Sequence, residues 1–209
     1  MGEKVKVSAS LWSADLTNLG AGLKQVEKYC DAYHFDIMDG HYVPYLLFGS
    51  DIVAALRPLT SKPFDIHLMV KNPDEIIDTF IEAGGDIFVL HAETCNDVLK
   101  TIRYLKSKGK KVGLALKVNE SCDDVLKYVS EIDIIVVMGT LIGIKGVSLD
   151  PDTYERIKYL KNKIRESNSD VIIQVDGGIR RETVPKLYES GADFVTAGSL
   201  LFNDDFFIE

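Results

Sequence analysis

Histidines and carboxylates recur at the ends of short apolar runs in this chain, at spacings that could bring them together. His34 and Asp36 stand two residues apart in HFDIMDGHYVP, residues 34–44. Asp65 and His67 have the same spacing in DIHLMV, residues 65–70. Residues two apart in a β-strand lie on one face of the sheet. A buried His or Asp is costly unless another group pairs with it, so the pattern predicts common partners for these side chains.

Three of the four histidines follow apolar runs in this way, which suggests a metal site. Two histidines and two carboxylates that converge at one place would supply mixed nitrogen and oxygen ligands for a divalent metal. The alternative is a set of hydrogen-bonded residues that close one end of a core, and for any single histidine that alternative is favoured. Four such residues on three strands favour the metal. The predicted ligands are His34, Asp36, His67 and Asp176.

Other polar residues near the same strand ends receive different interpretations. Asp39 and Asp65 are predicted to be turn residues or carboxylates that support the ligands, with Asp65 orienting a metal-bound histidine. His91 fits either role, and His41 is predicted to lie in a loop.

The elements that must position these residues alternate along the whole chain. Short β-rich runs occupy Val5–Ser10, Tyr33–Ile37, Phe64–Leu68, Ile87–His91, Val112–Leu116, Ile134–Met138, Val171–Val175 and Phe194–Ala197. Helix-like stretches separate them at Asn18–Tyr29, Ser50–Leu56, Pro73–Ala83, Asn96–Lys108, Cys122–Val129, Asp152–Ser167 and Thr183–Ser190. Such alternation predicts a parallel sheet.

Eight strands joined by right-handed crossovers predict a (β/α)8 TIM barrel. The alternative, an open doubly wound sheet, usually has a Gly-rich turn after its first strand, where this chain has SASLWSADL. No linker or low-complexity segment interrupts residues 1–209, so we predict one domain. The chain ends soon after the eighth strand, and the last helix is therefore expected to be short or absent.

In a TIM barrel, functional residues lie at the C-terminal ends of the strands. The sequences DGG after the seventh strand and AGS after the eighth offer backbone N–H groups that could hold a phosphate. The alternative is a pair of tight turns that need glycine. The candidate phosphate ligands are Gly177, Gly178, Gly198 and Ser199.

Composition excludes several classes of partner. The net charge of −8 argues against nucleic acid or an anionic membrane. The longest uncharged apolar stretch, Ile134–Ile144, is shorter than the roughly 20 residues that span a bilayer. Three widely spaced cysteines show no zinc or disulfide pattern, so we expect reduced thiols and a cytoplasmic protein.

Several of these motifs, in this order, resemble the ribulose-phosphate 3-epimerase family over nearly the whole chain. They are SASLWSADLTNL, HFDIMDGHYVP, DIHLMV, QVDGGI and GADFVTAGSLLF. The resemblance implies a TIM barrel with one divalent metal ion per subunit, among Zn²⁺, Fe²⁺, Mn²⁺ and Co²⁺, with zinc the ion most expected.

Residue roles carry over where the motifs match. The four predicted ligands would hold the metal, and Asp36 and Asp176 would be the acid and base. Ser10 and His67 would touch substrate. Met38, Met69 and Met138 would line the face near the reacting carbon, although ordinary packing is the alternative for any one methionine. Gly146 would join Gly177, Gly178, Gly198 and Ser199 in holding the phosphate.

One segment departs from the family pattern. The family usually has VNPGFGGQ after the sixth strand, where this chain has TLIGIKGV, residues 140–147. Lys145 stands where the family has glycine. It would supply a charge to the phosphate, or the loop would be shaped for a different sugar.

The implied reaction is epimerisation at C3 of a ketose phosphate through an enediolate, with D-ribulose 5-phosphate and D-xylulose 5-phosphate as the expected pair. A metal would stabilise the enediolate and two carboxylates would move the protons. The main alternative is another ketose such as D-allulose 6-phosphate. A sugar-phosphate lyase, which would commonly need a lysine on a strand, and a non-catalytic sugar-phosphate binding barrel are less favoured. We expect a small-molecule substrate, a homo-oligomer, and neither nucleic acid nor membrane as partner.

Overall fold

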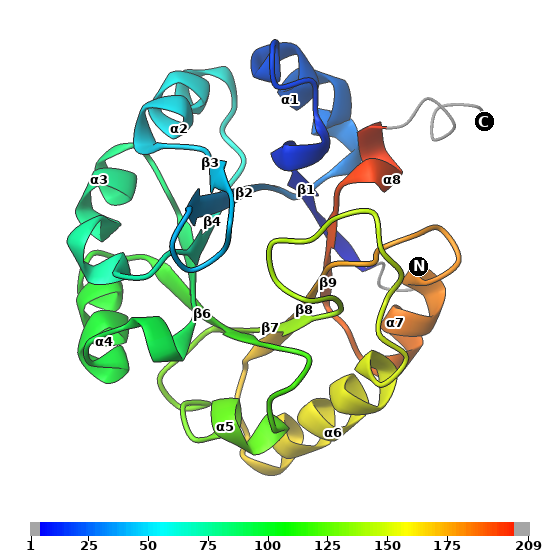
Figure 1. Cartoon of the computed structure of the whole chain (residues 1–209). Helices are drawn as coiled ribbons and strands as arrows, with labels where there is room; N and C mark the ends of the chain where they lie inside the picture. The colour runs from blue at the N-terminus through cyan, green and yellow to red at the C-terminus, as the bar shows by residue number, and fades with distance from the viewer. Residues whose placement is uncertain (1–4, 203–209) are drawn as a thin grey trace.

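Eight parallel strands close into a ring at the centre of the molecule (Figure 1). The structure, a computed structural model, describes residues 5–202. β1 pairs with β2 on one side and with β9 on the other, which closes the ring and confirms the predicted TIM barrel. The ring strands are β1 (Lys6–Ser10), β2 (Ala32–Asp39), β4 (Phe64–Met69), β5 (Ile87–Leu90), β6 (Lys111–Leu116), β7 (Ile134–Met138), β8 (Ile172–Asp176) and β9 (Phe194–Ala197).

Side chains of each strand alternate between the inside of the barrel and the surrounding helices. In β2, Phe35 and Ile37 belong to the large apolar core outside the ring. In β7, Val136 and Met138 pack inside the ring with Val89. Because the inner positions of β2 are His34 and Asp36, a polar layer replaces part of the apolar interior.

The helices form an outer layer around the ring (Figure 1). They are α1 (Leu19–Val26), α2 (Ser50–Leu56), α3 (Ile77–Glu82), α4 (Val98–Ser107), α5 (Cys122–Leu126), α6 (Thr153–Glu166), α7 (Val184–Ser190) and α8 (Ser199–Phe202). Asn18 and Asp97 cap α1 and α4 by accepting hydrogen bonds from the backbone of Ala21 and Lys100.

Several predicted boundaries were wrong by a turn or less. The predicted helix Pro73–Ala83 is a 3-10 turn at Pro73–Glu75 followed by α3, and the helix predicted over Asn18–Tyr29 ends in a 3-10 turn at Glu27–Tyr29. The last helix is present as α8 (Ser199–Phe202), and its expected shortness depends on residues 203–209, which lie outside the described part of the chain.

One small strand was not predicted. β3 (Leu46–Leu47) runs antiparallel to the end of β2, pairing with Asp39 and Met38. Gly40, with φ of 73°, begins the loop over residues 40–45 that reverses the chain here, and its N–H donates to the carbonyl of Tyr45. The segment after β2 is thereby folded back over the C-terminal end of the barrel.

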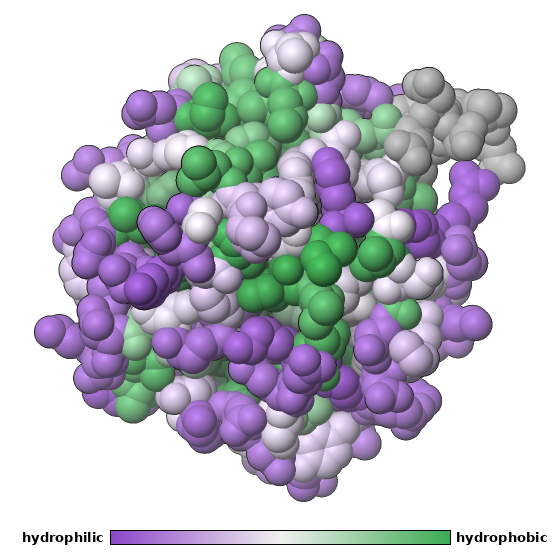
Figure 2. Space-filling view, in the orientation of Figure 1, coloured by the Kyte–Doolittle hydropathy of each residue, from purple (hydrophilic) through white to green (hydrophobic). Residues whose placement is uncertain are grey.

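The segment between β7 and α6 forms part of the same barrel end. Figure 2 shows apolar side chains gathered near the middle of this face, over that segment, where Leu141, Ile144 and Val147 are exposed. No helix in the described residues has the length and apolar character needed to cross a bilayer.

Candidate active site

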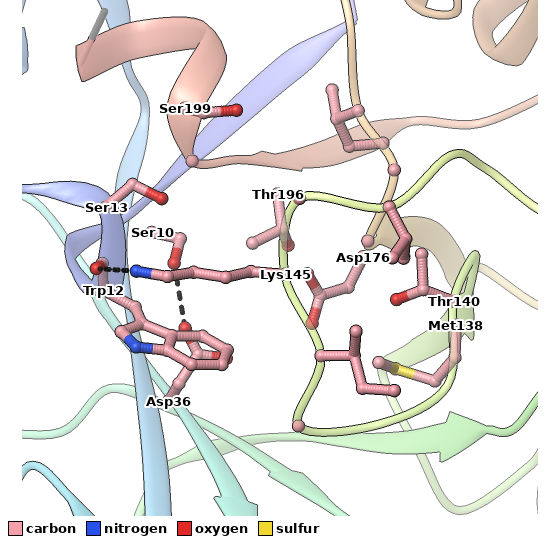
Figure 3. A pocket seen from close by; sticks show the side chains of 18 of the residues that line it. Ser10, Trp12, Ser13, Asp36, Met138, Thr140, Lys145, Asp176, Thr196 and Ser199 are labelled. Atoms are coloured by element: carbon pink, nitrogen blue, oxygen red, sulfur yellow. Dashed lines mark hydrogen bonds between the residues drawn. The ribbon is translucent and has the colours of Figure 1, made fainter.

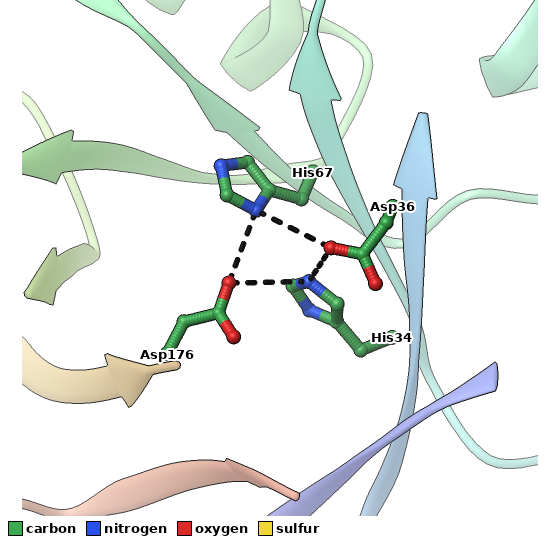
Figure 4. Close-up of side chains that lie close together, drawn as sticks. All are labelled: His34, Asp36, His67 and Asp176. Carbon is green, nitrogen blue, oxygen red and sulfur yellow. Dashed lines mark ion pairs between the residues drawn. The ribbon is translucent and has the colours of Figure 1, made fainter. Parts of the chain in front are cut away.

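Four side chains from three strands converge at the C-terminal end of the barrel (Figure 4). His34 and Asp36 come from β2, His67 from β4 and Asp176 from the end of β8. One possible ligand atom from each lies within 4.8 Å of the others. This is the set that the sequence predicted as metal ligands.

Strand register explains the convergence. His34 and Asp36 share the inner face of β2, and Asp36 is the partner of His67 in the neighbouring strand β4. Asp176 ends β8, one residue later than the predicted end of that strand, and pairs there with Met138 of β7. The parallel direction of the strands places all four at the same end of the barrel.

The facing atoms are spaced as ligands around a common point. Nε2 of His34 lies 3.3 Å from Oδ1 of Asp36 and 3.7 Å from Oδ2 of Asp176. Nδ1 of His67 lies 3.3 Å from Oδ2 of Asp176 and 4.0 Å from Oδ1 of Asp36. Two nitrogens and two carboxylate oxygens are a donor set that suits a divalent transition metal.

The two inward nitrogens accept or donate no hydrogen bond within residues 5–202. Nε2 of His34 and Nδ1 of His67 are buried and without a hydrogen-bonding partner among the described residues. Buried polar atoms in native proteins are nearly always paired, and these two point at the carboxylates of Asp36 and Asp176. The residues therefore fit a bound metal ion, which would satisfy both nitrogens.

Asp65 holds the outer nitrogen of His34. Its Oδ2 lies 2.7 Å from Nδ1 of His34, and because the carboxylate only accepts, Nδ1 carries a proton, so Nε2 is the nitrogen that could bind a metal. Ser8 and the amide of Gln174 also donate to this oxygen. This geometry agrees with the predicted orienting role of Asp65.

The pKa values of His34 and Asp36 are shifted so that the histidine is cationic and the carboxyl group is ionised. Burial alone would lower the pKa of His34, but the carboxylates of Asp65 and Asp36 outweigh it and hold the pKa well above its usual value. Burial would likewise raise the pKa of Asp36, but His34 and a hydrogen bond from Ser10 hold it low. Without a metal, Asp36 is therefore an ionised carboxylate beside a cationic His34, and a bound metal ion would take the place of the proton on Nε2 of His34.

Ser10 lies at the end of β1, beside the carboxylate of Asp36. Its hydroxyl donates to Oδ2 of Asp36 at 2.8 Å, which leaves Oδ1 facing the histidines. Ser10 also lines the cavity described below. The position of Ser10 suits a contact with substrate, and that contact stays a prediction.

The remaining strand-end residues separate into two kinds. Asp39 accepts hydrogen bonds from the backbone N–H groups of His41, Tyr42 and Lys71, so it is the turn residue that was predicted. His91, left open by the sequence, is fully buried with its Nε2 3.0 Å from Nε2 of His67. Burial, His67 and Lys117 together hold the pKa of His91 well below its usual value, so its ring is neutral.

A cavity of about 340 Å³ opens beside the four candidate ligands (Figure 3). His34 and His67 are fully buried behind it, and Met38 packs with Met69 and Val43 instead of lining it. Predicted site residues that line the cavity are Ser10, Asp36, Met69, Met138, Lys145, Gly146, Asp176, Gly177, Gly178, Gly198 and Ser199. Residues that the sequence did not single out include Trp12, Ser13, Thr140, Arg180 and Thr196.

Glycines at one end of the cavity are required by close packing of the backbone. Gly177 and Gly178 have φ of 94° and 71°. A Cβ at Gly178 would lie 2.5 Å from the backbone of Leu149, and one at Gly198 would lie 2.5 Å from the hydroxyl of Ser13. Positive φ and close packing therefore account for these glycines, and phosphate binding by their backbone stays a prediction.

Lys145 reaches across the cavity (Figure 3). Its Nζ donates to the carbonyl oxygen of Trp12 at 3.2 Å and lies 4.9 Å from the centre of the indole ring. Gly143 and Gly146, which flank it, have positive φ of 69° and 84°. The residue that departs from the family pattern thus brings a positive charge to the mouth of the cavity.

Comparison with known proteins finds relatives that match nearly the whole chain. A curated ribulose-phosphate 3-epimerase from Bacillus subtilis is 38% identical over 200 residues, covering 95% of this chain and 92% of that protein. One from Chlamydia pneumoniae is 35% identical over 206 residues, covering 97% and 90%. The solved 3-keto-L-gulonate-6-phosphate decarboxylase of Vibrio cholerae, at 16% identity, a TM-score of 0.72 and coverage of 97% and 92%, shares the fold alone.

The model of one protein family extends over almost the whole described chain. It is the model of the ribulose-phosphate 3 epimerase family, and it matches residues 6–202. Together with relatives above 30% identity over nearly their full length, this match shows that the chain belongs to the ribulose-phosphate 3-epimerase family.

Proposed function

We propose that this protein interconverts D-ribulose 5-phosphate and D-xylulose 5-phosphate by metal-dependent epimerisation at C3. The observation that carries the proposal is the group of two carboxylates and two unpaired histidine nitrogens at the side of a cavity. Family membership supplies the reaction class, isomerisation of a sugar phosphate.

Asp36 and Asp176 are the groups proposed to move protons. They reach the cavity from different strands, β2 and β8, which supports the proposal that each serves one face of the substrate carbon. One carboxylate removes the proton and the carbon becomes planar, and the other returns a proton to the opposite face. A divalent metal held by His34, Asp36, His67 and Asp176 would act as a Lewis acid on the substrate oxygens.

The ion is proposed to be Zn²⁺, Fe²⁺, Mn²⁺ or Co²⁺, with zinc the one we expect to find, because imidazole and carboxylate together suit these metals. We expect one ion per subunit. The expected homo-oligomer also stays a prediction.

Substrate contacts are proposed from the cavity lining. Ser10 lines the metal end and His67 lies buried behind it, and Met38, Met69 and Met138 form or back the apolar wall. Gly146, Gly177, Gly178, Gly198 and Ser199 are proposed to hold the phosphate. Among the lining residues in the described part of the chain, Lys145 is the one lysine, and it lies on a loop, which supports an epimerase over a lyase that uses a strand lysine.

A panel of ketose phosphates and free ketoses tests the substrate. We expect the highest kcat/KM with D-ribulose 5-phosphate, followed by formation of D-xylulose 5-phosphate in coupled assays or by NMR. The altered loop at residues 140–147 makes D-allulose 6-phosphate the second candidate, and a higher kcat/KM for it would replace the five-carbon assignment. Binding without exchange of the C3 proton with solvent would contradict catalysis altogether.

Changing Lys145 to Gly is expected to weaken binding of phosphorylated substrate. If the ammonium group leaves the carbonyl of Trp12 for the phosphate, its loss removes a charge-assisted hydrogen bond of about 1.5–3 kcal/mol. KM should then rise by a factor of about 10 to 150. Steady-state kinetics with the phosphorylated and the free ketose measure this effect.

Two comparisons isolate the role of the charge. Lys158→Gly changes an exposed lysine on α6, paired with Glu155, and should leave KM unchanged. The free ketose should also respond little to Lys145→Gly, because it has no phosphate. An unchanged KM for the phosphorylated substrate would show that Lys145 holds the loop through Trp12 and not the phosphate.

A further inference from the structure

A third histidine stands directly behind the candidate metal ligands. The ring of His91, which directly follows β5, is nearly parallel to the ring of His67, with centroids 5.1 Å apart and an interplanar angle of 16°. The two Nε2 atoms lie 3.0 Å apart, within hydrogen-bonding distance. Tyr42 covers another side of His91 at 5.0 Å between ring centroids. His91 is fully buried and lies outside the group of four ligands.

The short distance between the two rings fixes where their protons lie once His67 binds a metal. Nδ1 of His67 faces Asp36 and Asp176, and a metal ligand at this position must present a lone pair. The proton of a neutral His67 is then on Nε2. That proton points at Nε2 of His91, which must accept it and therefore keeps its own proton on Nδ1. A second proton on His91 would set two N–H groups against each other.

His91 keeps a costly polar atom in the core to make this bond. Its Nδ1 is buried and has no hydrogen-bonding partner among the residues that the structure describes. An unpaired buried N–H is destabilising, and an apolar ring of similar size would pack between Tyr42 and His67 without that penalty. Packing alone therefore does not explain a histidine here, whereas an acceptor for His67 does.

We propose that His91 is a positioning residue that accepts the hydrogen bond of His67 and so fixes the ring orientation and tautomer that present Nδ1 to the metal. The inference rests on the metal site of the proposed function and adds a residue to it. The two histidine ligands are then supported unequally: a carboxylate, Asp65, backs His34, and a neutral imidazole backs His67.

Zinc affinity of the protein, measured by competition with a chelator, tests this role without using activity. His91→Phe keeps a ring but removes the acceptor, and we expect zinc binding to weaken by about 10 to 100-fold, as for other groups that support metal ligands. His91→Gln places an amide oxygen where Nε2 was, and should restore most of the affinity. His41→Gln, which changes the exposed loop histidine, is the matched control and should bind zinc like the unaltered protein.

A second measurement needs no variant. Long-range ¹⁵N–¹H NMR correlations of the unaltered zinc-loaded protein report which nitrogen of each histidine is protonated. We expect the proton on Nδ1 of His91 and on Nε2 of His67. Protonation of Nε2 of His91 in the loaded protein would overturn the proposal even if His91→Phe does not fold.

The two proposals fail in different ways. If the unaltered protein binds zinc and a folded His91→Phe variant binds it equally well, the positioning role is wrong and the metal site stands. If phenylalanine and glutamine weaken zinc binding equally, the effect is packing and the hydrogen bond is not its cause. If the unaltered protein binds none of the four candidate metals, the metal site itself is wrong and the role of His91 falls with it.

Discussion

Asp176→Asn is expected to abolish net epimerisation in both directions while proton exchange continues on one face of the substrate. Each carboxylate is proposed to serve one face, so an amide at either position interrupts the transfer that inversion requires. Loss of general acid–base catalysis costs about 10² to 10⁴-fold in rate. Asp36→Asn should have the same effect, with exchange surviving on the other face.

Incubation with ketose phosphate in D₂O measures both properties at once. NMR follows formation of the second epimer and deuterium at C3 of the starting one. Because Asp36 and Asp176 are also proposed metal ligands, the metal content of each variant must be measured beside its activity. Loss of exchange together with loss of metal would report on the ligand role and not on proton transfer.

Asp97→Asn provides a matched control for the amide substitution. Asp97 caps α4 and does not line the cavity, and asparagine caps helices as well as aspartate does. Its activity should be unchanged. Substantial epimerisation by a metal-loaded Asp36→Asn or Asp176→Asn variant would rule out the assigned roles.

The barrel could be predicted because its strands and helices have different patterns of burial. The strands are buried on both faces and read as apolar runs, whereas the helices bury only one face. Runs such as Ile134–Met138 are apolar throughout, and the structure places a strand at the same residues. β3 escaped prediction because two residues, Leu46 and Leu47, carry no periodicity, and their pairing depends on the turn at Gly40. The predicted helices were longer than the observed ones because 3-10 turns have the same sequence preferences as helix ends.

The grouping of the four candidate ligands was predictable for a similar reason. A spacing of two on β2 and β4 fixes the face on which His34, Asp36 and His67 lie, and the parallel register fixes the end of the barrel. The role of His91 was not predictable, because it depends on a ring orientation that His67 and Tyr42 impose. Side chains in loops follow no repeating spacing that would show where they point. Nothing in the sequence near Lys145 or Trp12 therefore indicated their contact across 133 residues.

His34→Ala and His67→Ala should each reduce bound metal from one ion per subunit to well below one. Each removes one of the two nitrogen ligands, and the remaining histidine and two carboxylates hold zinc less tightly than four ligands do. Activity should fall with the metal, since the proposed Lewis acid is lost. Elemental analysis of protein purified without chelator measures the metal, and the exposed His41→Ala variant serves as control. A metal-free chain with full activity would contradict the metal-dependent mechanism.

In the absence of metal, His34→Ala and His67→Ala should differ in their free energy of unfolding. Asp65, fully buried, loses its charged partner in His34→Ala and keeps hydrogen bonds only from Ser8 and Gln174 in the described part of the chain. Breaking one side of a buried ion pair costs about 3–5 kcal/mol, because the other charge stays buried and uncompensated. His67 is backed by the neutral imidazole of His91, and in His67→Ala the buried carboxylates of Asp36 and Asp65 both keep His34 as their partner.

Urea unfolding with excess chelator should therefore give a lower free energy of unfolding for His34→Ala than for His67→Ala. The double variant His34→Ala, Asp65→Asn removes the unpaired charge and should recover part of that loss, while its metal binding stays impaired. If the two single variants are equally stable without metal, Asp65 does not carry a buried charge paired with His34. The support proposed for this ligand would then have to come from packing alone.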